Sequence, residues 1–152
     1  MIDRMIRDLC ALLGGREELS HVRFVTEYPG KQMEGPLRRP TVCIGLDGAE
    51  ITDAGIGRLI GSDTRGCRAE VTVGMGFYIP FSGDVQEAYR ILSDVTDVLL
   101  FDSAYALSRM NCGGLTADRN TGAFVMHVSF TFQVDFIRGN LDDGSIGCGT
   151  AV

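Results

Sequence analysis

The sequence has 152 residues, which is the size of one domain that can bury a core of its own. Its 45% hydrophobic and 22% charged residues are typical of a globular protein rather than a disordered or fibrous one. With 20 acidic and 14 basic side chains, the formal net charge of −6 argues against a nucleic-acid-binding protein, because phosphate binding needs clustered positive charge. No apolar stretch approaches the roughly 20 residues of a membrane span, and the amphipathic start is unlike a signal peptide.

A short amphipathic helix is predicted at the start of the chain. Apolar residues recur there at helical spacing from Ile2 to Leu13, and Gly14 with Gly15 would end the helix. A first strand is predicted from Val22 to Thr26. Proline and glycine then predict an exposed loop that reaches Pro40.

Two further strands are predicted in the middle of the chain. Residues 42–46 alternate between apolar and other types, and this strand continues weakly toward Ile51. The Gly, Asp and Arg content of residues 52–68 predicts a long loop or a broken hairpin. Residues 70–79 alternate clearly, with the odd-numbered positions apolar and Gly74 and Gly76 on the opposite face. Glycines there favour a bulge or the close approach of another backbone.

The clearest helix follows Pro80, which ends that strand. It is predicted over Asp84–Phe101, with Asp84 as the N-cap residue and Glu87 at the third helical position. One face of this helix is apolar and the opposite face is acidic. The apolar face comprises Val85, Ala88, Ile91, Leu92, Val95, Val98 and Leu99.

A closing hairpin is predicted after this helix. Residues 105–116 are expected to form a strand whose register is disturbed at Gly113 and Gly114, and residues 118–122 supply the turn. The return strand, residues 124–137, shows seven alternations between apolar and mostly polar positions. The glycine-rich residues 139–152 are interpreted as a mobile tail, or as an arm that a partner orders.

Together these elements predict one α+β domain over residues 1–138. Its antiparallel or mixed sheet has about four to five strands, with two helices packed on one face.

The sequence offers little that indicates catalysis. The glycine spacing of residues 55–61 differs from that of a dinucleotide-binding turn, which favours a flexible loop. His127 lies on the polar face of the last strand, where a general base is conceivable, but a hydrated or interfacial histidine is the preferred interpretation. Three acids, Asp47, Glu50 and Asp53, match no calcium loop. We therefore expect no enzyme activity, no metal and no cofactor.

The five cysteines are interpreted as structural thiols in a reducing compartment. None of them lies within four residues of another, so no zinc-binding pair of the Cys-x-x-Cys type is present. They are Cys10, Cys43, Cys67, Cys112 and Cys148.

Two segments of the sequence resemble one protein family. The runs VTVGMGFYIPFSGDVQEAYRILSDVTDVLL and LTADRNTGAFVMHVSFTFQVDF are similar to tail terminator proteins of bacteriophages. They also resemble the cap or collar subunits of phage-tail-like bacteriocins and contractile injection systems. In that family a strand ends in a Pro/Gly turn, a helix crosses the sheet, and a hairpin returns as a long strand. The resemblance covers residues 1–138, and the glycine-rich tail and five cysteines depart from it.

The resemblance implies a structural subunit that forms a homo-oligomeric, six-fold ring on the end of a tail tube and stops its polymerisation. Its partners would be the tube protein and, in a contractile system, the sheath protein. It would act in the cytoplasm of a bacterial host during assembly and then remain in the particle. The alternatives are a head-to-tail connector, neck or tail completion protein and, less favoured, a small enzyme.

Exposed loops on a rigid sheet are where we expect a ring subunit to contact its partners. The relevant segments are residues 30–39, 55–65, 118–122 and those after 138. Arg58 and Arg65 are the first choice for polar contacts, because arginine forms bidentate pairs with carboxylates and is enriched in interfaces. The full set of predicted interface residues is Arg58, Arg65, Arg38, Arg39, Asp118, Arg119 and Asn120.

Overall fold

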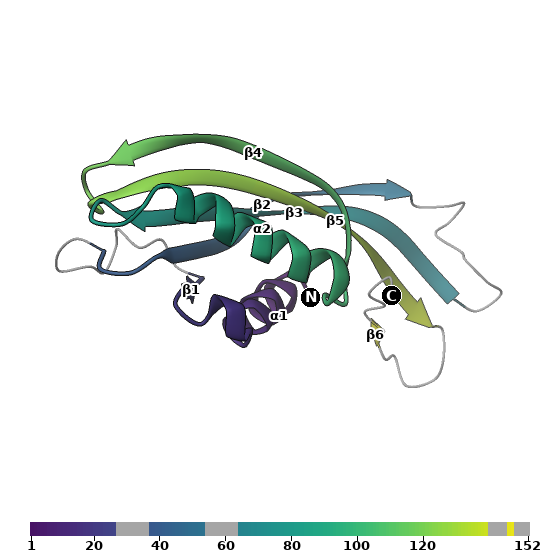
Figure 1. Ribbon diagram of the computed structural model, residues 1–152. Coiled ribbons are helices and arrows are strands. Elements are labelled where there is room, and N and C mark those ends of the chain that lie inside the picture. The colour runs from purple at the N-terminus through teal and green to yellow at the C-terminus, as the bar shows by residue number, and fades with distance from the viewer. Residues whose placement is uncertain (27–36, 54–63, 140–145, 148–152) are drawn as a thin grey trace.

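A computed structural model of the chain describes residues 1–26, 37–53, 64–139 and 146–147 (Figure 1). It has the predicted α+β fold with a mixed sheet. The strand order is β1-β2-β3-β5-β4, and the two-residue β6 pairs with β5. Among the described strands, the pairing of β1 with β2 is parallel and the others are antiparallel. The elements are α1 (Ile2–Gly14), η1 (Glu17–Leu19), β1 (Arg23–Val25), β2 (Thr41–Asp53), β3 (Thr64–Pro80), α2 (Gln86–Phe101), β4 (Ala106–Asp118), β5 (Ala123–Gly139) and β6 (Ile146–Gly147).

The long ladder between β3 and β5 is the centre of the sheet. Both strands are 17 residues long, and they pair from Thr64 with Gly139 to Pro80 with Ala123 without a register shift. Their apolar residues share the face on which both helices lie, which we call the inner face (Figure 1). The buried inner-face residues are Val71, Val73, Met75, Phe77 and Ile79 of β3 and Met126, Val128, Phe130, Phe132 and Val134 of β5, as the alternation predicts.

Both helices cover the inner face with the apolar stripes that the sequence predicts. Met5, Leu9 and Leu13 of α1 are buried, as are Ala88, Ile91, Val95, Val98 and Leu99 of α2. The second helix begins at Gln86 with Val85 as its N-cap, so the prediction of Asp84 as the N-cap is wrong by one residue. The Asp84 carboxylate still accepts a hydrogen bond from the Gln86 N–H at 3.0 Å, so it satisfies one of the unpaired amide groups at this helix end.

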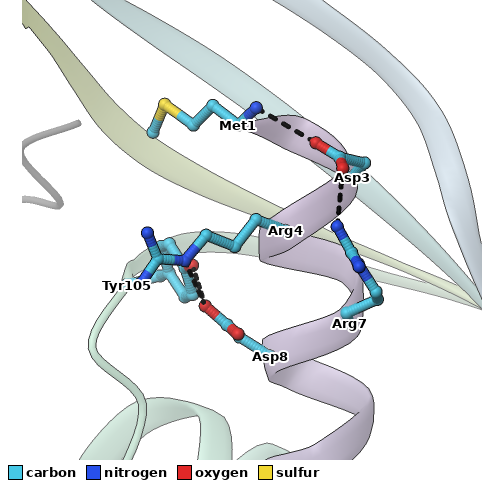
Figure 2. Close-up of polar contacts among 6 residues, drawn as sticks. All are labelled: Met1, Asp3, Arg4, Arg7, Asp8 and Tyr105. Atoms are coloured by element: carbon cyan, nitrogen blue, oxygen red, sulfur yellow. Dashed lines mark hydrogen bonds and ion pairs between the residues drawn. The ribbon is translucent and has the colours of Figure 1, made fainter. Parts of the chain in front are cut away.

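A polar contact attaches α1 to the segment between α2 and β4. The Tyr105 hydroxyl donates to the Asp8 carboxylate at 3.0 Å (Figure 2). The Tyr105 ring packs edge-on against Phe132. In the first turn of α1, Asp3 accepts a hydrogen bond from the Met1 amino group. That bond, the Arg4 N–H and the Arg7 guanidinium lower the pKa of Asp3 to about 2. Its negative charge is favoured at the N-terminus of a helix.

The hairpin of β2 and β3 is longer than predicted. Residues 52–53 and 64–68 were expected in a long loop, but they continue the two paired strands, so the hairpin interpretation is the correct one; residues 54–63 lie outside the described residues. The register of β2 against β3 shifts between Leu46 and Gly48 and again between Ile51 and Asp53. Between these shifts the pairing is regular.

The tail is partly structured. Gly139 belongs to β5, and Ile146 with Gly147 forms β6, which pairs with Ile137 and Arg138. The prediction that residues 139–152 contain little that could pack is therefore wrong at these positions. The rest of the tail lies outside the described residues. No helix in the described part of the chain is long and apolar enough to cross a membrane.

Gly74 and Gly76 of β3, for which a bulge or the close approach of a second backbone was predicted, are approached by side chains. The extra residue of the first β2 shift, Asp47, lies over Gly74, where an added Cβ would be 2.3 Å from the carboxylate oxygen. The same carboxylate accepts a hydrogen bond from the Ser129 hydroxyl of β5 at 3.0 Å. Gly76 faces the ring of Tyr78, which an added Cβ would approach to 2.9 Å. The predicted bulge is in β2 rather than in β3, at Asp47 opposite Thr72 and Val73.

Phe130→Ala or Phe132→Ala should destabilise the fold by about 3–5 kcal/mol, because both side chains are 0% exposed and each truncation leaves a cavity. Thermal and denaturant unfolding measure this change. Phe101→Ala serves as the control, since that ring is 76% exposed and should change stability by less than about 0.5 kcal/mol. Equal effects for the three variants would contradict the burial of the β5 face.

Gly74→Ala should displace the Asp47 carboxylate and destabilise the protein by about 1 kcal/mol, because the Ser129 hydrogen bond is lost. Gly45→Ala is the matched control on the paired residue of β2, where an added Cβ meets nothing within 4 Å. The difference in free energy of unfolding between the two variants is the measured quantity. A Gly45 variant as unstable as the Gly74 variant would contradict this explanation.

Candidate interaction surface

Three segments that are distant in the sequence meet at one end of the sheet. The Leu37 N–H donates to the Thr121 carbonyl at 2.9 Å, and the Phe81 N–H donates to the Gly122 carbonyl at 3.0 Å. These bonds join the residues before β2, the residue after β3 and the turn between β4 and β5. We call this region, residues 37–40, Phe81 and residues 118–122, the turn end; it is at one tip of the long strands in Figure 1.

The turn between β4 and β5 is held by its own side chains. The Asp118 carboxylate accepts hydrogen bonds from the Asn120 N–H at 3.0 Å and from the Thr121 hydroxyl at 2.9 Å. Gly122 has a φ of 65°, which glycine adopts without steric cost. Because Thr121 is also buried, the backbone here is well constrained. This is the turn chemistry that the sequence predicts.

A second, smaller apolar cluster supports the turn end. Leu37, Tyr78 and Ala123 are buried together on the outer face of the sheet, the face opposite the helices. Phe81 packs edge-on against Phe124 with ring centroids 4.9 Å apart, yet it remains 44% exposed. An exposed aromatic ring on a rigid frame is typical of interface anchors. The sequence signal for Phe81 was a large apolar residue placed between a strand and a turn.

The turn end also presents positive charge. Arg38, Arg39 and Arg119 are exposed, and none of them forms an ion pair with another described residue. Several other arginines are paired: Arg7 is 2.8 Å from Asp3, and Arg68 is 2.9 Å from Asp135. In a protein with a formal charge of −6, three arginines without such partners form a distinct surface. Guanidinium groups in this state can bind carboxylates of another molecule.

Five of the seven predicted interface residues therefore gather at the turn end: Arg38, Arg39, Asp118, Arg119 and Asn120. The Asp118 carboxylate accepts a hydrogen bond from Thr121 within the turn, so its role there is structural. Arg65 was predicted in a loop, but it lies in β3 and pairs with Arg138 toward the opposite end of the strand. Arg58 lies outside the described residues.

The middle of the outer face is connected by polar contacts between strands. Arg109 of β4 is 3.4 Å from Glu70 of β3, and the hydroxyls of Thr72 and Thr131 are 3.1 Å apart. His127 is exposed on this face and forms no hydrogen bond to Ser129 among the described residues. The Ser129 hydroxyl donates to Asp47 instead.

The described residues contain no group of three or more His, Cys, Asp or Glu side chains that could hold a metal ion. Burial raises the pKa of the Cys10 thiol, and burial followed by the nearby Cys10 raises that of Cys43. Raised pKa values disfavour reactive thiolates. Cys112 is exposed on β4, Cys67 is half-buried, and Cys148 lies outside the described residues.

No protein-family model matches the chain, and no curated protein is significantly similar to it.

Asp118→Ala should destabilise the protein by about 1–2 kcal/mol. Two hydrogen bonds in the turn are lost, and the buried Thr121 hydroxyl loses its carboxylate acceptor. Asn120→Ala is the control, since it keeps the N–H that Asp118 accepts, and its stability should remain close to that of the unmodified chain. Urea unfolding of both variants measures the difference. Equal stability of the two would mean that the turn does not depend on Asp118.

Proposed function

We propose that this protein is a structural subunit that caps the end of a phage or phage-like tail tube as an oligomeric ring and stops its polymerisation. The observation on which the proposal rests most is the turn end. There, exposed arginines and an exposed Phe81 sit on a turn fixed by internal hydrogen bonds. Such a surface is suited to contact by shape and charge, and it supports assembly rather than catalysis.

The layout of the domain also supports a capping subunit. A ring subunit must contact identical neighbours at its sides and a different protein along the ring axis. The turn end lies at the tips of the strands, whereas β4 lies along one side of the sheet (Figure 1). Lateral and axial contacts can therefore use separate surfaces of one rigid sheet.

The charge of the turn end indicates the chemistry of its partner. Three exposed arginines favour a partner surface with exposed carboxylates, because the arginine guanidinium forms bidentate pairs with carboxylates. Phe81 would occupy the centre of the contact, with the arginines around it, in the arrangement common to interface hot spots. The proposed axial partner is thus an acidic rim of the tube protein.

Arg38→Glu combined with Arg119→Glu should leave the domain folded but prevent capping, so that tails of uncontrolled length accumulate. Electron microscopy of particles from cells that produce the variant measures the tail lengths. Arg4→Glu combined with Arg7→Glu changes the charge equally on α1, outside the turn end, and should give normal lengths. Normal tail lengths for both variants would mean that capping does not depend on the arginines of the turn end.

Deletion of the gene tests the function itself. Overlong or irregular tails support a terminator, whereas tails of normal length that lack heads support the connector or neck alternative. Normal, complete particles after deletion would overturn the proposed function. Restoring the unmodified gene should restore the normal length distribution.

A further inference from the structure

Both sides of the described sheet offer backbone that no described strand pairs. β4 pairs with β5 along one side only, and its other side has no partner strand among the described residues. At the opposite edge, β1 covers only Thr41–Cys43 of β2, so β2 lacks a described partner on that side from Ile44 onward. Unpaired strand edges are templates for the addition of another strand.

The two edges have regular stretches of the same length. Register shifts interrupt β4 between Leu107 and Arg109 and again after Cys112, which leaves Arg109–Cys112 in regular pairing with β5. In β2, the shifts leave Gly48–Ile51 in regular pairing with β3. Each edge thus presents a regular stretch of four residues between bulges. These stretches are short enough to limit unspecific pairing but long enough to specify a register.

On the inner face, both stretches carry apolar side chains. Met110 and Cys112 of β4 pair with the inner-face residues Phe130 and Val128, so they point to the helix side. Ala49 and Ile51 of β2 pair with Val71 and Ala69 and point to the same side. Met110 is 41% exposed and Ile51 is 53% exposed. Both edges therefore expose apolar side chains on the inner face, where joining two edges would bury them.

The outer face adds charge complementarity. Arg109 and Asn111 of β4 pair with Thr131 and Ser129, and Gly48 and Glu50 of β2 pair with Thr72 and Glu70. An edge-to-edge joint that keeps the two faces continuous would bring Arg109 beside Glu50. Opposite charges on facing strands stabilise a sheet, whereas like charges destabilise it.

Strand direction also permits the joint. Each of the pairings β2 with β3, β3 with β5 and β5 with β4 is antiparallel, so β2 and β4 run in opposite directions. If a second copy continues the sheet in the same orientation, its β2 meets β4 of the first copy in antiparallel pairing. Because this contact uses two different surfaces, it repeats from copy to copy and can close into a ring.

We propose that copies of this protein join head to tail, with residues 109–111 of one copy pairing antiparallel with residues 48–50 of the next, so that Arg109 lies opposite Glu50 and Met110 lies opposite Ala49 and diagonal to Ile51. The proposal deepens the capping function, on which it rests for its biological setting, by naming the lateral joint of the ring. It uses backbone hydrogen bonds for affinity, Met110 and Ile51 for apolar contact, and Arg109 with Glu50 for direction.

An apolar hollow beside the β2 edge fits the same joint. It has a volume of about 340 Å³ and is lined on the inner face mainly by Ile2, Ala49, Ile51, Cys67, Ala69 and Phe136. On β4, Met110 lies next to α2, because its sulfur is 3.5 Å from the Thr96 hydroxyl. Tyr89 and Leu100 of the same helix are exposed. The joint would bring this apolar flank of one copy toward the hollow of the next.

A mixing experiment with charge-reversed variants tests the joint. Native mass spectrometry and sedimentation of the full chain are expected to show oligomers larger than a dimer. Glu50→Arg and Arg109→Glu should each weaken association by about tenfold or more, because each places like charges in the joint. An equimolar mixture of the two variants should restore oligomers that alternate between them, since every joint then has opposite charges.

Controls separate the joint from folding. Arg90→Glu, which reverses a charge on α2, should leave the oligomers intact. Glu50→Arg is the more informative variant, because Arg109 also contacts Glu70 in its own chain, and thermal unfolding of both variants shows whether they remain folded. If only Arg109→Glu unfolds, Arg109→Gln takes its place, because a mixture of Arg109→Gln with Glu50→Arg has no joint with like charges and should still restore oligomers.

The outcomes distinguish this inference from the function. Oligomers that persist in both single variants, or a mixture that stays dissociated, would overturn the joint while leaving capping to be decided by the deletion. An unmodified chain that stays monomeric across its accessible concentrations would also overturn the joint. Restored mixed oligomers together with normal tails after gene deletion would support the joint and overturn the capping function.

Discussion

The uninterrupted ladder between β3 and β5 is the feature on which the other parts of this structure depend. It holds the inner apolar residues in one continuous row, and both helices pack against that row. The strands at its sides have register shifts, whereas the ladder itself has none. A long twisted sheet needs such bulges where the outer strands must bend more than the central ones. The ladder therefore sets the positions of the helices, the edges and the turn end.

Charge is distributed along this ladder in a consistent way. In the middle of the sheet, Arg68 is paired with an acid on the neighbouring strand β5, and Arg109 of β4 with an acid on β3 across β5, which offsets their charges there. At the turn end, Arg38, Arg39 and Arg119 lack such partners among the described residues. Paired surface charges contribute little to stability, but they reduce the attraction of the central face for charged partners.

The sequence predicted the parts of this fold that local periodicity determines. The alternation of residues 124–137 identified β5 and its buried face, and the apolar stripes identified α1 and α2, because each pattern spans enough residues to average over exceptions. The length of β2 and β3 was underestimated, since glycine and charge in residues 52–68 resemble a loop when the pairing partner is unknown. Strand pairing decides such segments, and it is a tertiary property.

The candidate surface shows the same limit. Arg38, Arg39 and Arg119 were chosen individually as loop arginines, but their proximity depends on hydrogen bonds that join Leu37 and Phe81 to the turn at residues 121–122. No sequence period encodes a meeting of three such distant segments. Arg65 was misplaced for a related reason, because its strand is defined by its pairing with β5 and not by its own residues.

The contact of Asp47 with Ser129 has a consequence for the alignment of the sheet. These residues belong to β2 and β5, which are not neighbours, and the carboxylate reaches across the glycine of the strand between them. A slip of β2 by one residue would bring a different side chain over Gly74 and separate the carboxylate from the hydroxyl, besides turning the apolar residues of β2 outward. The hydrogen bond between Ser129 and Asp47 can form only when all three strands are correctly aligned, so it favours that alignment. A subunit that bears force along its strands would keep its shape through such a cross-sheet contact.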